Sequence, residues 1–317
     1  MSSQAAAYRR RALAAALAVT VLWSSSWVII RVGLRHDRLP PLTFAGLRYV
    51  IAAVALWAAV ALNRNARGQL ARLTRRSGGH LAVLGVVFYA VTQGAQFVAI
   101  DSQPVATTSL FLTLTPLLVG LASGRLLSER LGRAQAAAAV LVPAGAAAYL
   151  TGTLGATPAG LAACAVALAA NAGSSLLGRG INRDPATAPL VTTTVSMTIG
   201  AVVLLAAGLG IQGRPALSPE AVAIIAWLAI VNTAVAFTLW NWSLRHLTAG
   251  ESSVVNNAML PQIGLLGWVF LGEAPGLAQW AGMILVSAGV ALGQYRQRPA
   301  ALAAKDRPRA SPPGQPD

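Results

Sequence analysis

Apolar stretches of about twenty residues alternate with short polar loops along almost the whole chain. A stretch of that length suits an α-helix that crosses the hydrocarbon core of a bilayer. Transmembrane β-strands would instead show alternating hydrophobicity over about ten residues. The pattern therefore predicts ten membrane-spanning helices, at 12–34, 42–62, 81–100, 105–127, 134–152, 159–178, 188–211, 220–243, 250–272 and 276–295.

The composition supports an integral membrane protein. Hydrophobic residues make up 56% of the chain and charged residues only 10%, which excludes an ordinary soluble domain. The first apolar stretch is long for a signal peptide and lacks a clear small-residue cleavage site, so we expect a retained helix. The single cysteine, Cys164, excludes an internal disulfide framework.

The positive charge is arranged along the chain as a topology signal. A net charge of +15 could suggest nucleic acid, but the basic residues sit in short loops, so no nucleic-acid partner is expected. Nineteen lie on the side of the two termini and three on the other side. The positive-inside rule therefore predicts a multi-pass protein of the cytoplasmic membrane with both termini in the cytoplasm. Residues 296–317, rich in proline and charge, are expected to form a disordered cytoplasmic tail.

The chain contains an internal repeat. In each half, an apolar segment carries a proline, Pro116 or Pro261, and ends at a glutamate, Glu129 or Glu273. Beyond the glutamates, identical residues recur at an offset of 144: Gly132 with Gly276, Gln135 with Gln279, and Gly145 with Gly289. We predict two five-helix units, 12–152 and 159–295. Because five is odd, the second unit enters the membrane from the opposite side, which gives an inverted repeat.

Several motifs carry a family resemblance. They are LWSSSW at 22–27, FAGLRYV at 44–50, the two proline-to-glutamate helices, and LWNWSLRHLTAGESS at 239–253. The chain resembles a ten-helix EamA-type member of the drug/metabolite transporter superfamily. The resemblance implies a secondary carrier with a central cavity, lined mainly by helices one, three, four, six, eight and nine. It favours export, but it implies no particular substrate.

Polar and aromatic side chains inside the apolar segments are the candidates for substrate contact. On the third segment they recur at i, i+4 and i+7, one face of a helix. Shifted by 144 residues, the same stripe reads Thr233, Phe237 and Trp240. An aromatic and amide-lined cavity suits an amphipathic metabolite, although the amides could equally bond helices to one another. The predicted substrate-binding residues are Trp23, Ser26, Tyr89, Gln93, Gln96, Asn171, Ser174, Phe237, Trp240, Ser253, Asn256 and Asn257.

Charged residues and prolines in the segments have further expected roles. Arg48, about seven residues into the second segment, either snorkels outward or binds an anionic group such as a substrate carboxylate. Arg31, near a helix end, is expected to snorkel. Pro116 and Pro261 are candidate hinges, and Glu273, like Glu129, is expected to cap or anchor the first turn of the next helix.

An integral membrane enzyme or a membrane sensor is the alternative to a transporter. An enzyme would need catalytic groups inside the apolar segments, but His36, His80 and His246 fall in or beside loops. HExxH, GxSxG and P-loop motifs are absent. We therefore predict a non-enzymatic secondary exporter of small metabolites such as amino acids or drug-like compounds. It needs no cofactor or metal, and its partners are a small-molecule substrate, the bilayer and, at most, a second copy in a weak homodimer.

Overall fold

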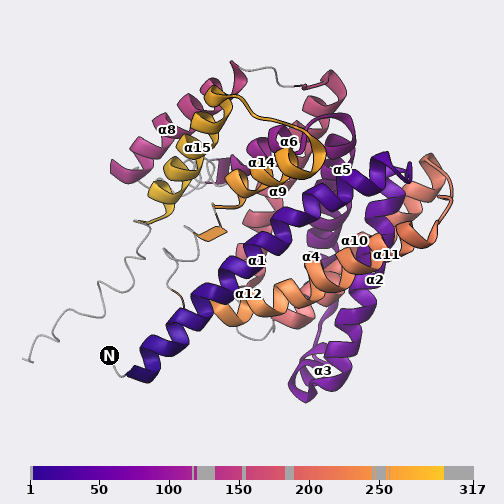
Figure 1. Cartoon of the computed structure of the whole chain (residues 1–317). Helices are drawn as coiled ribbons and strands as arrows, with labels where there is room; N and C mark the ends of the chain where they lie inside the picture. The colour runs from indigo at the N-terminus through magenta and orange to yellow at the C-terminus, as the bar shows by residue number, and fades with distance from the viewer. Residues whose placement is uncertain are drawn as a thin grey trace, which may run out of the picture.

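The computed structural model describes residues 3–115, 118–119, 133–151, 155–182, 189–244, 247, 255–256 and 258–295. Over these ranges the secondary structure is entirely helical, and the helices pack into one bundle (Figure 1). The prediction of an all-helical protein is therefore confirmed.

In the first half, the described helices overlap the predicted segments, although several bounds differ. They are α1 (Ser3–Arg35), α2 (Pro41–Leu62), α3 (Arg64–Leu70), α4 (Arg75–Gly85), the π-helical η1 (Val86–Thr92), α5 (Gln93–Ser102), α6 (Val105–Thr113) and α8 (Arg133–Leu150). α4, η1 and α5 follow one another without a break and form one long rod.

The second half is also built of helices. Its elements are α9 (Pro158–Asn182), α10 (Pro189–Ile211), α11 (Pro219–Ala229), the π-helical η2 (Ile230–Val235), α12 (Ala236–Leu244), α14 (Met259–Leu271) and α15 (Leu277–Tyr295). Within the described ranges, five helices are long and apolar enough to cross a membrane: Arg10–Arg35, Pro41–Leu62, Arg75–Ser102, Pro158–Gly178 and Pro189–Ile211. Shorter apolar helices, such as Met259–Leu271, accompany them.

Local sequence signals explain several helix ends. α11 begins at Pro219 after Ser218, whose hydroxyl oxygen accepts the Ala221 N–H at 2.9 Å; serine is a favoured N-cap and proline a favoured first residue. α14 ends at Gly272, whose φ of 70° lies in the left-handed region that glycine adopts without strain. The short helix α3 falls where a loop was expected. It begins after Asn63, whose side chain accepts the Ala66 N–H at 3.1 Å.

Two predicted segments, 105–127 and 250–272, are interrupted. α6 ends at Thr113, and the Leu114 N–H bonds the Phe111 carbonyl at 3.1 Å, a tight i→i−3 turn. The Ala258 N–H bonds the Val255 carbonyl in the same way at 3.2 Å. Each turn lies two or three residues before the proline of its half, Pro116 or Pro261, and proline can donate no backbone hydrogen bond. The two turns are 144 residues apart.

The two π-helices also recur at this offset, since η1 begins at Val86 and η2 at Ile230. In each, a threonine hydroxyl donates to the carbonyl five residues earlier: Thr92 to Val87 at 2.9 Å and Thr233 to Leu228 at 2.8 Å. π-helical turns are rare and are found frequently at functional sites. The helix faces beside η1 and η2 are therefore candidates for the functional site.

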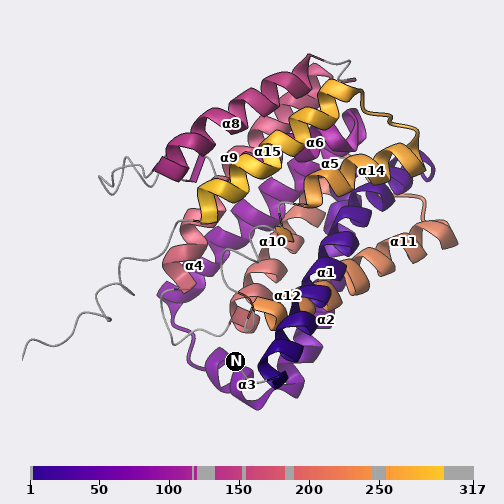
Figure 2. The ribbon, with the colours of Figure 1, turned by 60° about the vertical axis from the view of Figure 1, so that its left-hand side comes forward.

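Two helix pairs form the outer walls of the bundle. α2 packs along α10, and α8 packs along α15, the latter pair at the upper left of Figure 1; Figure 2 shows the same pair from another side. In the second pair the backbones touch, because a Cβ on Gly145 would lie 2.8 Å from the Gly282 carbonyl oxygen. Small residues permit such close approach between helices in membranes.

The remaining helices cross between the halves in a reciprocal way. α1 packs against α12 and α14 of the second half, and α9 packs against η1, α5 and α6 of the first. The first helix of each half therefore packs against the third and fourth predicted segments of the other half.

Candidate functional site

Three of the predicted substrate-binding residues come together as an aromatic cluster. The Trp23 ring of α1 lies 5.3 Å, centroid to centroid, from both the Phe237 and the Trp240 rings of α12. The interplanar angles of 59° and 54° are tilted geometries that aromatic pairs favour. All three side chains are half-buried, so the cluster offers ring faces to a ligand.

The polar stripe of the third predicted segment spans η1 and α5. Tyr89 is buried, and its ring lies 5.6 Å from the Tyr49 ring in an edge-on arrangement. Gln93 and Gln96 are half-buried, and neither amide forms a hydrogen bond with the described residues. Their donors and acceptors therefore remain available to a polar ligand.

The predicted polar residues of α1 and α9 are held locally. Ser26 donates to the Trp23 carbonyl at 2.6 Å, and Ser174 to the Asn171 carbonyl at 2.9 Å. The Asn171 amide donates to the Thr115 hydroxyl at 3.0 Å and so joins α9 to the segment after α6. The serine bonds stay within their own helices, whereas the Asn171 contact is of the helix-joining kind that the sequence left open for the amides.

The remaining predicted residues lie at the start of α14 or before it. Pro116, Ser253 and Asn257 fall outside the described residues, and Asn256 is exposed. Pro261 is the third residue of α14. A missing N–H in the first turn breaks no intrahelical hydrogen bond, so in α14 the interruption lies at the turn before the proline.

A hydrogen-bonded amide in α14 was not among the predicted residues. The Gln262 carbonyl oxygen accepts the Ser24 hydroxyl at 2.9 Å, and its nitrogen lies 3.3 Å from the Thr20 hydroxyl. This amide therefore fixes α14 against α1. The signal that could have found it is an amide directly after a proline inside an apolar segment.

Asn232 of η2 is a second buried amide that sequence reasoning missed. Its nitrogen donates to the Leu22 carbonyl and lies 3.3 Å from the Ser25 hydroxyl. Its carbonyl oxygen is buried without a partner. Asn232 and Thr233 are adjacent polar residues in the middle of an apolar segment, and this pair is the signal that could have found Asn232.

Arg48 is enclosed by protein, with 6% of its surface exposed, so of its two predicted alternatives the outward snorkelling one is wrong. Its Nη2 donates to the Thr233 hydroxyl at 3.2 Å. The guanidinium carbon lies 5.2 Å from the Tyr49 ring centroid and 6.0 Å from that of Phe97. Its Nε has no hydrogen-bond partner. α2, η2 and α5 thus surround a cation that has no carboxylate beside it among the described residues.

Arg31 is also buried, with 2% exposed, and the expectation that it snorkels is likewise wrong. Its Nη1 donates to the carbonyls of Ile100 and Asp101 at the end of α5, the latter at 2.6 Å. Its Nε lies 3.6 Å from Oε1 of Glu273. The helix end supplies carbonyls that no intrahelical donor satisfies, and these draw the guanidinium inward.

Glu273 caps a helix, but not the one that follows it in sequence. Its Oε2 accepts the Val105 N–H at the start of α6, at 2.9 Å. At α15, the Gln279 side chain accepts the Gly276 N–H instead, at 2.7 Å. Burial raises the pKa of Glu273, while the Val105 N–H and the Arg31 guanidinium act to lower it. We call Arg31, Glu273 and these backbone partners the helix-end clamp.

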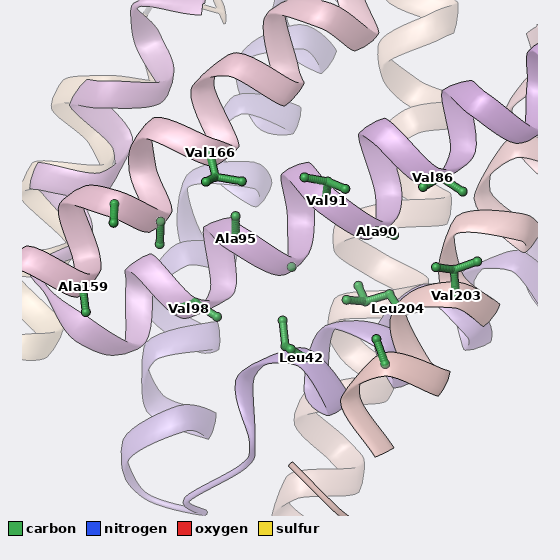
Figure 3. Close-up of a pocket in the computed structure, with 14 residues that line it drawn as sticks. Leu42, Val86, Ala90, Val91, Ala95, Val98, Ala159, Val166, Val203 and Leu204 are labelled. Carbon is green, nitrogen blue, oxygen red and sulfur yellow. The ribbon is translucent and has the colours of Figure 1, made fainter. Parts of the chain in front are cut away.

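A separate apolar groove of about 550 Å³ lies between three walls, which are the rod of η1 and α5, the helix α9, and the helix α10. Figure 3 shows Val91, Val98, Val166 and Val203 among the residues that line it, with Leu42 below the rod of η1 and α5 in this view. Its lining is entirely apolar, so it offers no group that could recognise a polar metabolite. None of the predicted substrate-binding residues lines it.

An all-helical bundle with an apolar exterior and buried amides, hydroxyls and arginines has the architecture of a multi-pass membrane transporter. The chain belongs to the EamA-like transporter family, whose sequence pattern matches residues 10–151 and 159–293. The resemblance seen in the sequence is thereby confirmed.

Two relatives and one solved structure are similar to the chain. The "Probable amino-acid metabolite efflux pump" of Salmonella typhimurium is 26% identical over 297 residues, 88% of this chain and 93% of that protein. YdzE of Bacillus subtilis, a permease-like protein, is 43% identical over 67 residues, 21% of this chain and 85% of that protein. A crystal structure with 22% identity and a TM-score of 0.62 covers 89% of this chain and 97% of that chain, and it supports the fold alone.

Proposed function

We propose that the protein is a secondary exporter of small amino-acid-related metabolites. It works in the cytoplasmic membrane by alternating access between inverted five-helix repeats, 12–152 and 159–295. The substrate binds between the repeats, beside the cluster of Trp23, Phe237 and Trp240 and the stripe of Tyr89, Gln93 and Gln96.

The observation that carries this proposal is the reciprocal exchange of helices between the halves. α1 packs on α12 and α14, and α9 packs on η1, α5 and α6. The turns at Leu114 and Ala258 and the π-helices η1 and η2 recur at the same 144-residue offset. In an inverted repeat, the two halves can exchange conformations, so that the site opens first to one side of the membrane and then to the other.

The substrate class is supported by the relative's printed name and by the chemistry of the site. An amino-acid metabolite is what the name of the Salmonella typhimurium relative assigns to that protein. In this chain, ring faces from α1 and α12 and unpaired amides from α5 suit a molecule with a polar head and an apolar body.

The helix-end clamp supplies a closed gate for the cycle. It joins the ends of α1, α5 and α14 to the start of α6, and the predicted topology places all four ends on the outer side of the membrane. With these ends held together, access from the outside is blocked. Export then requires the clamp to separate as the inner ends close.

The test is efflux from liposomes that contain the purified protein. Liposomes loaded in turn with each labelled amino acid should release at least one of them faster than protein-free liposomes. Replacing a substrate-binding amide, as in Gln93→Ala, should raise KM about ten- to hundred-fold, since it removes about 1–3 kcal/mol of binding. Val91→Ala, on the exposed apolar face of the same rod, is the matched control and should leave KM unchanged.

Two outcomes would contradict the proposal in different ways. Release of no amino acid or related metabolite would refute the substrate class. Unchanged KM in Gln93→Ala, with transport intact, would remove Gln93 from the site. An enzyme or sensor without transport would release nothing at all, which distinguishes it from a transporter with an unexpected substrate.

The topology has its own test. Arg214 and Arg72 are exposed in loops that the charge pattern places outside and inside the cell. In intact cells, an impermeant maleimide should label Arg214→Cys and spare Arg72→Cys, while the buried Cys164 stays unlabelled. The reverse labelling of the two introduced cysteines would overturn the orientation.

A further inference from the structure

Arg48 is a buried cation that the described part of the chain leaves incompletely paired. Four carboxylate residues are described, Asp37, Asp101, Glu220 and Glu273, and none of them forms an ion pair with it. Removing a cation from water costs several kcal/mol unless a partner compensates, and an ionisable residue inside a membrane bundle is by default a candidate for function.

The partners that Arg48 does have stabilise its charge without neutralising it. The Thr233 hydroxyl accepts from Nη2 while it donates to the Leu228 carbonyl, so its proton is already committed. The Tyr49 and Phe97 rings offer cation–π contacts, which strengthen when the cation is desolvated. Nε stays unpartnered. The guanidinium therefore lacks an acceptor for at least one N–H.

The residue lies where the two predicted substrate stripes begin. Its guanidinium donates to Thr233. Phe237 and Trp240 follow Thr233 at i+4 and i+7, so the three residues share one face of the same helical rod. The neighbouring Tyr49 packs on Tyr89, which is followed by Gln93 and Gln96 at the same spacing. Tyr89 and Thr233 are themselves equivalent at the 144-residue offset. Arg48 thus joins the corresponding faces of the two halves.

We propose that Arg48 is the carboxylate receptor of the transport site. A carboxylate matches a guanidinium because its two oxygens can accept two parallel N–H bonds. An anion bound there would pair the unsatisfied Nε and leave the rest of the molecule directed along the aromatic and amide stripes. The substrates are therefore metabolites with a free carboxylate and an apolar body. This assignment rests on the proposed transport function.

The first test needs no variant. Thermal stability of the purified wild-type protein is measured with each amino acid and with the matching amino-acid amide, which keeps the side chain and loses the carboxylate. At least one amino acid should raise the melting temperature, and its amide should bind about ten- to hundred-fold more weakly. An amide that binds as tightly as its acid would overturn the receptor assignment, whatever the fate of any variant.

The second test uses Arg48→Met, which keeps the length of the side chain and removes the charge. Replacing an unpaired buried charge with an apolar group is expected to preserve folding. The variant should lose the difference between acid and amide, and Arg48→Lys should recover only part of it, because an ammonium cannot bind bidentately. The exposed Arg35→Met is the matched control and should behave as wild type.

The outcomes separate this inference from the proposed function. If an amino acid is exported and Arg48→Met exports it with wild-type KM, the receptor assignment is wrong and the transporter remains. If the wild-type protein neither binds nor exports any of the amino acids, the proposed substrate class is wrong, and the receptor assignment falls with it.

Discussion

Arg31 and Arg48 are two arginines buried in the same bundle with opposite surroundings. Arg31 has two backbone carbonyls and a carboxylate around its guanidinium. Arg48 has one hydroxyl and two aromatic rings. The Nε of each arginine lacks a hydrogen bond, but that of Arg31 has the Glu273 carboxylate 3.6 Å away, whereas that of Arg48 has no carboxylate of the described residues beside it. Burial by itself does not therefore distinguish a structural charge from a functional one. The number and kind of acceptors around the charge does.

The difference follows from where each arginine meets its neighbours. Arg31 faces the end of α5, where the last turn of a helix leaves carbonyls without intrahelical donors. Arg48 faces the middle of η2 and α5, where the backbone groups bond one another and only side chains can respond. A helix end thus pairs a cation at once, whereas a mid-helix surface leaves room for an external anion.

The largest expected effect is from Arg31→Ala. Removing one partner of a buried ion pair leaves Glu273 unpaired, so the free energy of unfolding should fall by about 3–5 kcal/mol. Thermal or denaturant unfolding in detergent measures this loss. The double variant with Glu273→Ala should lose less than the sum of the two single variants. Simple additivity would mean that the two side chains do not interact.

Glu273 allows the capping and charge roles of the clamp to be separated. Glu273→Gln keeps an oxygen that can accept the Val105 N–H, whereas Glu273→Ala removes it. Loss of such a cap costs about 1 kcal/mol, so the alanine variant should be less stable than the glutamine variant by about that amount. Equal stability of the two would show that the cap to α6 contributes nothing.

The threonines of the two π-helices test whether the hydroxyl beside Arg48 contributes to binding. Thr233→Val removes the hydroxyl that holds Arg48, and Thr92→Val removes one that bonds only the backbone. Each should lower the free energy of unfolding by about 1 kcal/mol. Only Thr233→Val should weaken carboxylate binding, by about three- to tenfold. An identical loss in both variants would detach Thr233 from the receptor.

The smallest expected effect is a pH dependence of the clamp. Burial raises the pKa of Glu273 above its ordinary value, so the folded state holds its proton more tightly than the unfolded state. The stability that this adds is present below the ordinary pKa and is lost as the pH rises through the raised one. Unfolding measured over that interval should show a slope that Glu273→Gln lacks. A matching slope in the variant would assign it to other groups.

The helical class and the family could be predicted from residues alone, because both depend on signals that run along the chain. Apolar runs of bilayer length indicate helices and not strands. Motifs such as FAGLRYV are short contiguous sequences, so the family resemblance can be recognised without the fold. The helix bounds followed for the same reason. Within the part of the chain that the structure describes, predicted continuous helices break at 105–127 and at 250–272, at turns two or three residues before a proline.

The candidate site was predictable in part. The spacing of Phe237 and Trp240 placed them on one face, and Trp23 does meet them. Gln262 and Asn232 were missed, since an isolated amide in an apolar run carries no periodic pattern. Whether such an amide joins helices or lines a site depends on which side chains of the neighbouring helices lie within hydrogen-bonding distance of it.

The sequence by itself therefore determined an all-helical membrane transporter of the EamA-like family and a repeat with an offset of 144 residues. Only the tertiary structure decided which charges are paired. Arg31 and Arg48 both read as arginines near the start or end of an apolar segment, and both were candidates for snorkelling. Their partners, Glu273 and Thr233, lie far along the chain, and a contact between distant residues depends on how helices pack. A one-dimensional pattern shows which segments are apolar, while the burial and the compensation of a charge are properties of the assembled bundle.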